Sequence, residues 1–170
     1  VLAAACGGTG EGILTALAGF PGVGRRLEVR FDDGITVLDD YGHHPTAIDA
    51  TLATVRRRYP GRPLILAIEP LTYHRTAALL GPLARACAAA DRVAVADIFA
   101  VRDTDLSITS AAALAAEIRL LGTPAEAPGS VEATADAVAA TIIPHAVVVV
   151  MGGGRSTDLA TRLSAALGAR

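Results

Sequence analysis

The most informative segment of the sequence is Ile35-Thr36-Val37-Leu38-Asp39-Asp40-Tyr41-Gly42-His43-His44-Pro45-Thr46. Its first four residues are apolar or β-branched, which predicts a strand. Two carboxylates, a phenol and two imidazoles follow. Pro45 then stands where the first turn of a helix would begin, a position at which its missing N–H costs nothing. The polar residues therefore fall at the carboxyl end of a strand, which is where ligands bind in an open α/β sheet.

A hairpin is predicted just upstream of this segment. Residues 27–31 alternate apolar and polar side chains, as a half-exposed strand does. Asp32-Asp33-Gly34 is a hairpin turn signal, because Asp33-Gly34 can adopt positive φ. We therefore expect residues 27–31 and 35–38 to pair in an antiparallel manner.

Downstream, short apolar runs alternate with helical patterns. The runs predict inner parallel strands at 64–68, 93–96 and 146–150, with a short edge strand at 123–127. Helices are predicted at 46–59, at 110–121, from 130 onward and at 158–167. A further helix is predicted to follow the polar segment 69–76 and to run through residue 90. This alternation predicts a Rossmann-like three-layer α/β domain with a mostly parallel sheet and an antiparallel N-terminal hairpin.

Length, composition and charge limit the classes of protein to which the chain can belong. The chain has 170 residues, of which 52% are hydrophobic and 4% aromatic, so one domain with a core of small aliphatic side chains is expected. The net charge of −2 with interspersed signs gives no sign of a nucleic-acid footprint or a polybasic membrane patch. The longest apolar run, near residues 146–151, is too short to span a membrane. The opening residues lack the basic region of a signal peptide, so a cytoplasmic protein is expected.

No metal site is predicted. Cys6 and Cys87 have no CxxC partner and no histidine at metal-ligand spacing, and we expect both to be buried free thiols. His43 and His44 are adjacent but have no evident third ligand.

The N-terminal 20 residues predict two short helices separated by a glycine-rich break at 7–12. The break does not fit a phosphate-binding loop, because no strand precedes it and no Lys-Ser/Thr pair follows it. A flexible connector is expected instead. The chain also starts without methionine in the middle of a helical pattern, which suggests an excised fragment.

Three polar segments should meet at one edge of a parallel sheet, namely residues 40–44, 69–76 and 151–157. Together they offer carboxylate, imidazole, phenol, guanidinium and backbone N–H groups, which suit a phosphorylated or carboxylated ligand. The turn Gly152–Gly154 has two interpretations. It could bind an anion through its N–H groups, or it could be a tight turn that packs a helix.

Two motifs resemble those of a known family. Residues 39–46 resemble the signature that opens the third domain of the Mur ligases. Gly22-Val23-Gly24-Arg25-Arg26-Leu27-Glu28 resembles the segment by which that family enters the domain, and the two motifs occur in the family's order at about its spacing. The resemblance implies that residues 1–23 are a remnant of the central ATP-binding domain and its linker. Residues 24–170 would be the C-terminal domain, with Arg25 and Arg26 as interdomain or hinge contacts.

The resemblance also implies roles for residues of the first loop. Asp40 would lie by the ribose of the nucleotide, with His44 as a second cofactor contact, and Tyr41 and His43 would contact the substrates. Each has a structural alternative. Asp40 could cap the helix that begins at Pro45, Tyr41 could wedge the loop against the sheet, and one of the two imidazoles is expected to be structural.

Arg75 is the third expected substrate contact. Tyr73-His74-Arg75-Thr76 is similar to the end of the family's Pro-His-Arg-Tyr-x-Arg-Thr segment, in which an arginine grips the carboxylate of the incoming amino acid. The alternative is a salt bridge at the rim. Leu71 and Thr72 replace the His-Arg pair of that segment, and Ala77 replaces a further arginine, so this chain offers fewer guanidinium groups to an anion.

As the resemblance implies, the parent enzyme would join UDP-N-acetylmuramate to an amino acid in peptidoglycan synthesis. It would use ATP and Mg²⁺, both held mainly by the other domains of the ligase. The fragment itself lacks a Gly-Lys-Thr phosphate loop and is expected to be inactive alone, closing over the central domain in the whole enzyme. Two alternatives stay open: a ligase that attaches a recycled tripeptide, and a non-catalytic nucleotide- or partner-binding module.

Overall fold

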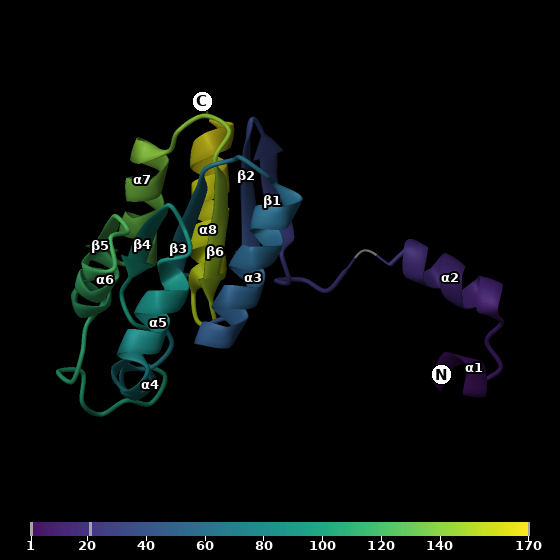
Figure 1. The fold of residues 1–170 in the computed structure, drawn as a ribbon, viewed down its shortest axis with the longest axis horizontal. Coiled ribbons are helices and arrows are strands. Elements are labelled where there is room, and N and C mark those ends of the chain that lie inside the picture. Colours follow the sequence, from purple (N-terminus) through teal and green to yellow (C-terminus); the bar gives the residue numbers. More distant parts are fainter. Residues whose placement is uncertain (1, 21, 170) are drawn as a thin grey trace.

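The computed structural model describes residues 2–20 and 22–169. Six strands form one sheet in the order β1-β2-β6-β3-β4-β5 (Figure 1). The first two strands pair in an antiparallel manner through a turn at Gly34, which has φ of 68°, and every other neighbouring pair is parallel. The strands are β1 (Glu28–Asp33), β2 (Ile35–Asp40), β3 (Leu64–Glu69), β4 (Arg92–Ala96), β5 (Ala125–Gly129) and β6 (Val147–Gly152). The predicted mixed sheet is therefore confirmed.

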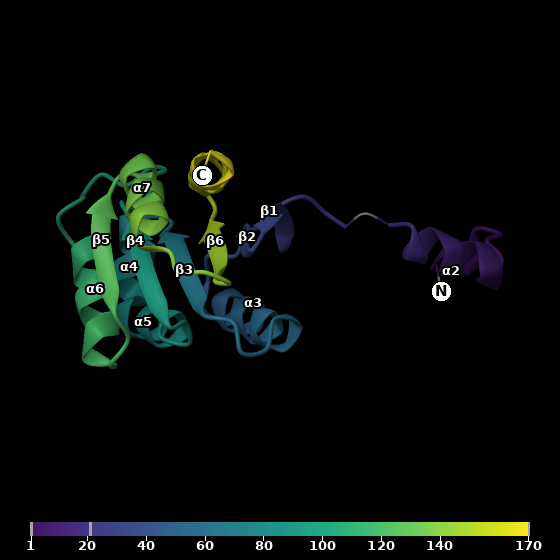
Figure 2. The ribbon, with the colours of Figure 1, turned by 90° about the horizontal axis from the view of Figure 1, so that it is seen from above.

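Helices cover both faces of the sheet, as Figure 2 shows. One buried apolar cluster joins α3, α5 and α6 to one face, and a second joins α7 and α8 to the other. The helices are α3 (Pro45–Arg58), α4 (Tyr73–Ala78), α5 (Leu80–Cys87), α6 (Ala111–Leu120), α7 (Val131–Thr141) and α8 (Ser156–Gly168). The three-layer α/β architecture is thus confirmed.

The central position of β6 in the sheet explains why its sequence is a continuous apolar run. Val147, Val148, Val149 and Val150 are at most 1% exposed, and their side chains alternate between the two clusters. A strand that is buried on both faces has no solvent side on which polar residues would be favoured.

The face of the sheet to which the chain goes when it leaves a strand changes along the sequence. Strands β2, β3 and β4 lead into helices on the first face, whereas β5 and β6 lead into α7 and α8 on the second face. Because β6 lies between β2 and β3, the loops at its carboxyl end diverge from those of both neighbours. Such a switch point is the usual location of a ligand site in an open α/β sheet.

Two further helices, α1 (Leu2–Ala5) and α2 (Gly10–Ala18), stand apart from the sheet in both ribbon views (Figures 1 and 2). No residue of α2 is buried. The helix begins inside the expected connector because the hydroxyl of Thr9 accepts the N–H of Gly12 at 3.2 Å and caps it. Within the described ranges no helix is long and apolar enough to cross a membrane.

Two expectations were wrong. The single helix expected to run through residue 90 is divided at Leu79, because Pro82 has no N–H to give to the carbonyl of Ala78 and its ring would clash there. Cys6 is exposed rather than buried, since it follows the short helix α1 at a distance from either apolar cluster. Cys87 is fully buried, and burial raises the pKa of its thiol to about 12.

Candidate functional site

Three polar loops begin side by side at the carboxyl edge of the sheet. In the strand register, Asp40 at the end of β2 lies opposite Met151 of β6, and Glu69 at the end of β3 lies opposite Gly152. The loops that follow β2, β6 and β3 therefore start at the same level, as the alternation of strands and helices predicted. This edge is the candidate functional site.

Asp40 is almost completely buried, with 5% of the residue exposed. Its Oδ1 accepts the N–H of Gly42 at 2.8 Å, and its Oδ2 accepts the N–H of Leu27 at 3.1 Å. A Cβ at Gly42 would lie 2.8 Å from both Oδ1 of Asp40 and the methyl carbon of Met151, so a side chain there would displace the Asp40 carboxylate or the end of Met151. Asp40 thus ties the segment before β1 to the loop after β2. Its contact with a ribose stays a prediction.

Tyr41 and His43 lie together on the loop after β2. Their rings meet edge to face, with centroids 5.5 Å apart. Nδ1 of His43 is 3.1 Å from the carbonyl oxygen of Tyr41, and since a carbonyl can only accept, Nδ1 carries the hydrogen. The same Nδ1 would lie 3.2 Å from a Cβ on Gly153, so the ring borders the turn after β6. The structure therefore brings these two predicted substrate contacts to the switch point.

His44 has a different position. Its exposed imidazole accepts the N–H of Thr46 through Nδ1 at 3.3 Å and so caps helix α3, which begins at Pro45. Of the two imidazoles, His44 is therefore the one with a helix-capping contact. Its contact with a nucleotide stays a prediction.

Arg75 lies in the short helix α4, which follows β3 at the same edge of the sheet. The helix begins after Thr72, whose φ of 62° is unusual for a β-branched residue and whose hydroxyl accepts the N–H of Arg75 at 3.3 Å. The side chain of Arg75 is exposed, and within residues 2–20 and 22–169 no hydrogen bond or ion pair engages its guanidinium. This arginine is therefore available to an external anion rather than held in a rim salt bridge.

The turn after β6 is occupied by a carboxyl group of the chain itself. Glu69, 2% exposed, accepts the N–H of Ser156 at 2.8 Å through Oε2 and so faces the first turn of α8. Burial raises the pKa of this carboxyl, and the backbone N–H groups of Ser156, Arg155 and Gly154 oppose that rise. Of the two interpretations of the glycine-rich turn, binding of an external anion is disfavoured, because an internal carboxylate already faces these N–H groups.

Close packing explains the glycines of this turn. A Cβ on Gly154 would lie 2.7 Å from Cδ2 of Phe99 and 2.8 Å from Oε2 of Glu69. A Cβ on Gly152, which has φ of 156°, would lie 2.9 Å from the carbonyl oxygen of Glu69. The turn is therefore the tight packing turn of the second interpretation.

Arg25 has a structural role that the sequence did not suggest. Its guanidinium donates through Nη2 to the carbonyl oxygen of Gly152 and to Oγ of Ser156, both at 2.8 Å, and its Nε lies 3.5 Å from Oδ1 of Asp39. It also lies over the ring of Tyr41, 5.1 Å from the centroid. We expected an interdomain or hinge contact, but these partners all lie within the domain. Since its partners lie 14 to 131 residues away in sequence, no local pattern pointed to them.

We call the contacts of the Arg25 guanidinium with Asp39, Gly152 and Ser156 the clamp. Asp39 is its buried acidic member. Its side chain has no exposed surface, and burial raises the pKa of its carboxyl, while Arg25 and the hydroxyl of Thr157 oppose the rise. Thr157 donates to Oδ2 at 3.2 Å. Asp39 therefore acts in holding β2 against the start of α8 rather than in facing a ligand.

Metal ligands do not gather at this edge. Among the described residues, no three side chains of His, Cys, Asp or Glu lie close enough together to hold a metal ion. The carboxylates of Asp39, Asp40 and Glu69 are each engaged by hydrogen-bond donors of the chain.

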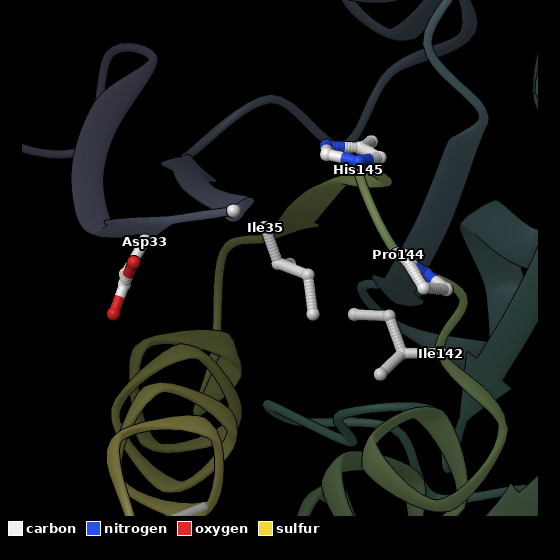
Figure 3. Close-up of a pocket in the computed structure, with 6 residues that line it drawn as sticks. Asp33, Ile35, Ile142, Pro144 and His145 are labelled. Atoms are coloured by element: carbon white, nitrogen blue, oxygen red, sulfur yellow. The ribbon is translucent and has the colours of Figure 1, made fainter.

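A separate cavity of about 240 Å³ lies at the opposite, amino-terminal edge of the sheet (Figure 3). Ile35, Ile142 and Pro144 form its apolar part, and Asp33 and His145 stand at its border. None of the predicted site residues lines it, and we assign it no part in the candidate site.

The family model for the Mur ligase glutamate ligase domain matches residues 25–164. A curated relative, the UDP-N-acetylmuramate–L-alanine ligase of Chloroflexus aggregans, is 37% identical over 153 residues, which is 89% of this chain and 32% of that protein. The chain therefore spans about a third of the length of this relative.

Two solved structures are similar over nearly the whole chain. The UDP-N-acetylmuramate–alanine ligase of Thermotoga maritima matches with a TM-score of 0.82 and 22% identity, covering 99% of this chain and 35% of that one. The murein peptide ligase of Psychrobacter arcticus matches with a TM-score of 0.68 and 25% identity, covering 91% and 32%. Family model, sequence relative and folds agree, and the chain belongs to the Mur ligase family.

Proposed function

We propose that the chain is the C-terminal domain of a cytoplasmic, ATP-dependent ligase that joins UDP-N-acetylmuramate to an amino acid, most simply L-alanine, in peptidoglycan synthesis. Residues 1–23 then belong to the central ATP-binding domain and its linker, and residues 24–170 form the domain that closes over the active site. The observation that carries the proposal is the placement of Tyr41, His43 and the helix of Arg75 at one switch point of the sheet.

The proposed reaction has two steps. The terminal phosphoryl group of ATP passes to the muramoyl carboxylate, which gives an acyl phosphate and ADP. The amino nitrogen of the second substrate then attacks the acyl carbon. The new C–N bond forms, the C–O bond to phosphate breaks, and the nitrogen loses one proton as phosphate leaves.

The residues of this domain position the substrates in this scheme. The guanidinium of Arg75, which no described residue engages, presents a planar fork to the carboxylate of the incoming amino acid. Tyr41 and His43 contact the substrates from the neighbouring loop, and Asp40 and His44 lie on the nucleotide side. Mg²⁺ does not fit the described residues, which offer no cluster of ligands. We therefore assign the metal to the rest of the ligase and derive no step through it here.

A second candidate is a ligase that attaches a recycled tripeptide. The chain's likeness to a murein peptide ligase supports it, as do Leu71, Thr72 and Ala77, which stand where the resembling segment carries the His-Arg pair and a further arginine. A site with fewer guanidinium groups favours a longer ligand, whose additional contacts compensate for a weaker hold on one carboxylate.

The test is an assay of the complete ligase that contains this chain. It is incubated with ATP and UDP-N-acetylmuramate and with either L-alanine or the tripeptide, and ADP and the ligated product are measured. Product with L-alanine supports the first candidate, and product with the tripeptide alone supports the second. If neither gives product while nucleotide or a partner still binds, the domain is a non-catalytic module and the proposal is wrong.

Arg75 gives the sharper test of the site. We expect Arg75→Ala to raise the KM for the amino acid or peptide at least tenfold, since a bidentate charged contact is lost, and Arg75→Lys to recover part of it. Arg57→Ala is the matched control, because Arg57 is an exposed arginine on α3 whose hydrogen bond is to Thr54. An unchanged KM in Arg75→Ala contradicts the assigned role.

The isolated chain should not catalyse ligation. Phosphoryl transfer depends on positioning and charge neutralisation. The sequence has no Gly-Lys-Thr phosphate loop, and residues 2–20 and 22–169 offer no cluster of metal ligands. Titration calorimetry of residues 1–170 with ATP should show binding weaker than micromolar. Micromolar affinity would show that this domain holds the nucleotide without its neighbours.

A further inference from the structure

Asp103, in the loop between β4 and α6, reaches back over the start of helix α4. Its side chain is 6% exposed although the residues on either side of it are exposed. One carboxylate oxygen accepts the N–H of Tyr73 at 2.7 Å, and the other accepts the N–H of His74 at 3.4 Å. A carboxylate from a distant loop therefore caps the first turn of α4.

The same carboxylate binds the side chain of that turn. Nδ1 of His74 lies 2.7 Å from Oδ1 of Asp103, and the imidazole is 64% exposed. Since the carboxylate accepts the Nδ1 hydrogen, the ring is held in one orientation. This contact with His74 lowers the pKa of the Asp103 carboxyl, so Asp103 is ionised when it caps the turn.

Helix α4 needs such support. It has six residues, too few to be stable by its own hydrogen bonds, and it follows Thr72 with its positive φ. Thr72 supports it from within the chain by accepting the N–H of Arg75. Asp103 supports it from a different loop, the one between β4 and α6. The segment before the helix is tied to the loop after β4 through its backbone, since the N–H of Thr72 donates to the carbonyl oxygen of Phe99 at 3.0 Å. Asp103 adds a side-chain contact from the same loop to the first turn of α4 itself.

Arg75 lies in the turn that these caps hold. The described residues do not engage its guanidinium, so its position is set only through its backbone. On the basis of the function proposed above, we propose that Asp103 and His74 form a latch that positions Arg75 for the carboxylate of the incoming amino acid or peptide. Asp103 and His74 are positioning residues in this assignment, because they act through α4.

The test compares the Michaelis constants of the complete ligase for its three substrates. Asp103→Ala should raise the KM for the amino acid or peptide about tenfold, because the helix that carries the binding group is displaced. The KM values for ATP and UDP-N-acetylmuramate should change by less than about twofold. Asp103→Asn keeps an acceptor for the N–H of Tyr73 and should recover part of the loss. Thr104→Ala is the control, because Thr104 is the exposed neighbour of Asp103 in the same loop.

A double-mutant cycle separates the latch from a general effect on folding. If Asp103 acts through Arg75, its substitution should have little further effect on that KM once Arg75 is alanine. Additive effects would overturn the latch. If Asp103→Ala does not fold, His74→Gln tests the latch instead, because His74 is at an exposed position. It should raise the KM for the amino acid or peptide about threefold at an unchanged melting temperature. An unchanged KM in His74→Gln would also overturn the latch.

The failure of the latch and the failure of the proposed function give different results. If Arg75→Ala raises the KM of the incoming substrate but Asp103→Ala and His74→Gln do not, the latch is wrong and the site stands. If Arg75→Ala itself has no effect, the assignment of Arg75 is wrong and the latch, which depends on it, is overturned with it.

Discussion

The carboxylate of Glu69 accepts the backbone N–H of Ser156 at 2.8 Å. A side chain of the protein itself therefore occupies the N-terminus of α8 at the switch point of the sheet. The carboxylate comes from the end of β3, and the N–H belongs to the first residue of α8. The positive end of the α8 dipole is thus neutralised by a residue of the chain rather than by a ligand. In the function proposed above, the substrates at this edge are contacted by Tyr41, His43 and Arg75 instead.

Removing this carboxylate should destabilise the domain. We expect Glu69→Ala to lower the free energy of unfolding by about 1–3 kcal/mol, because it leaves buried N–H groups at the start of α8 without an acceptor. Urea denaturation of the 170-residue chain measures the change. Glu117→Ala, on the partly exposed side of α6, is the control and should change stability by less than about 0.5 kcal/mol. Equal effects of the two substitutions would contradict the role of Glu69.

The raised pKa of Glu69 should also make the stability of the domain depend on pH. Its folded-state pKa is raised above the ordinary value of 4.5, so the folded state binds this proton more tightly than the unfolded state does. The stabilisation is present below pH 4.5 and is lost as the pH rises through the folded-state pKa. The stability of the natural chain relative to Glu69→Gln should therefore fall as the pH rises across this window. Other carboxyls cancel in that difference, and a flat difference would show that the pKa is not raised.

Arg25 and Arg26 form a matched pair of neighbours with different contacts. Arg25→Ala should cost about 3 kcal/mol, since it leaves the carboxylate of Asp39 buried without its cation. Arg26→Ala should cost about 0.5 kcal/mol, because the described contact of its guanidinium is with the face of the Tyr41 ring, at 5.8 Å. Thermal and urea unfolding would measure both. Asp39→Asn should recover part of the loss in Arg25→Ala, and similar costs at the two positions would count against the clamp.

Gly154 should not tolerate a side chain. Gly154→Ala places a Cβ within 2.8 Å of both the Phe99 ring and the Glu69 carboxylate, and we expect a loss of about 1–3 kcal/mol. Gly81→Ala is the comparison, because its Cβ would lie 3.5 Å from the nearest atom, on Arg85, inside helix α5. That substitution should be neutral or stabilise by up to about 1 kcal/mol. A well-tolerated Gly154→Ala would mean that the turn is looser than described.

The sequence by itself determined the kinds of element and the edge at which the polar residues gather. Apolar runs, the Gly34 turn and the serine caps of α6 and α7 act over a few residues, so they can be read directly from the chain. The placement of Asp40, Tyr41 and His43 at the end of a strand followed from the same local patterns. Pro82 was also a local signal, although its effect on the expected long helix was missed.

Only the tertiary structure decided which of these groups are free and which serve the fold. The insertion of β6 between β2 and β3 brings Ser156 within reach of Glu69 and of Arg25, and the bend of the loop after β4 brings Asp103 to His74. These partners are 29 to 131 residues apart in sequence. Hydrogen bonds and ion pairs act over a few ångströms, so a contact between such distant residues exists only once the packing of the sheet and helices has placed them together.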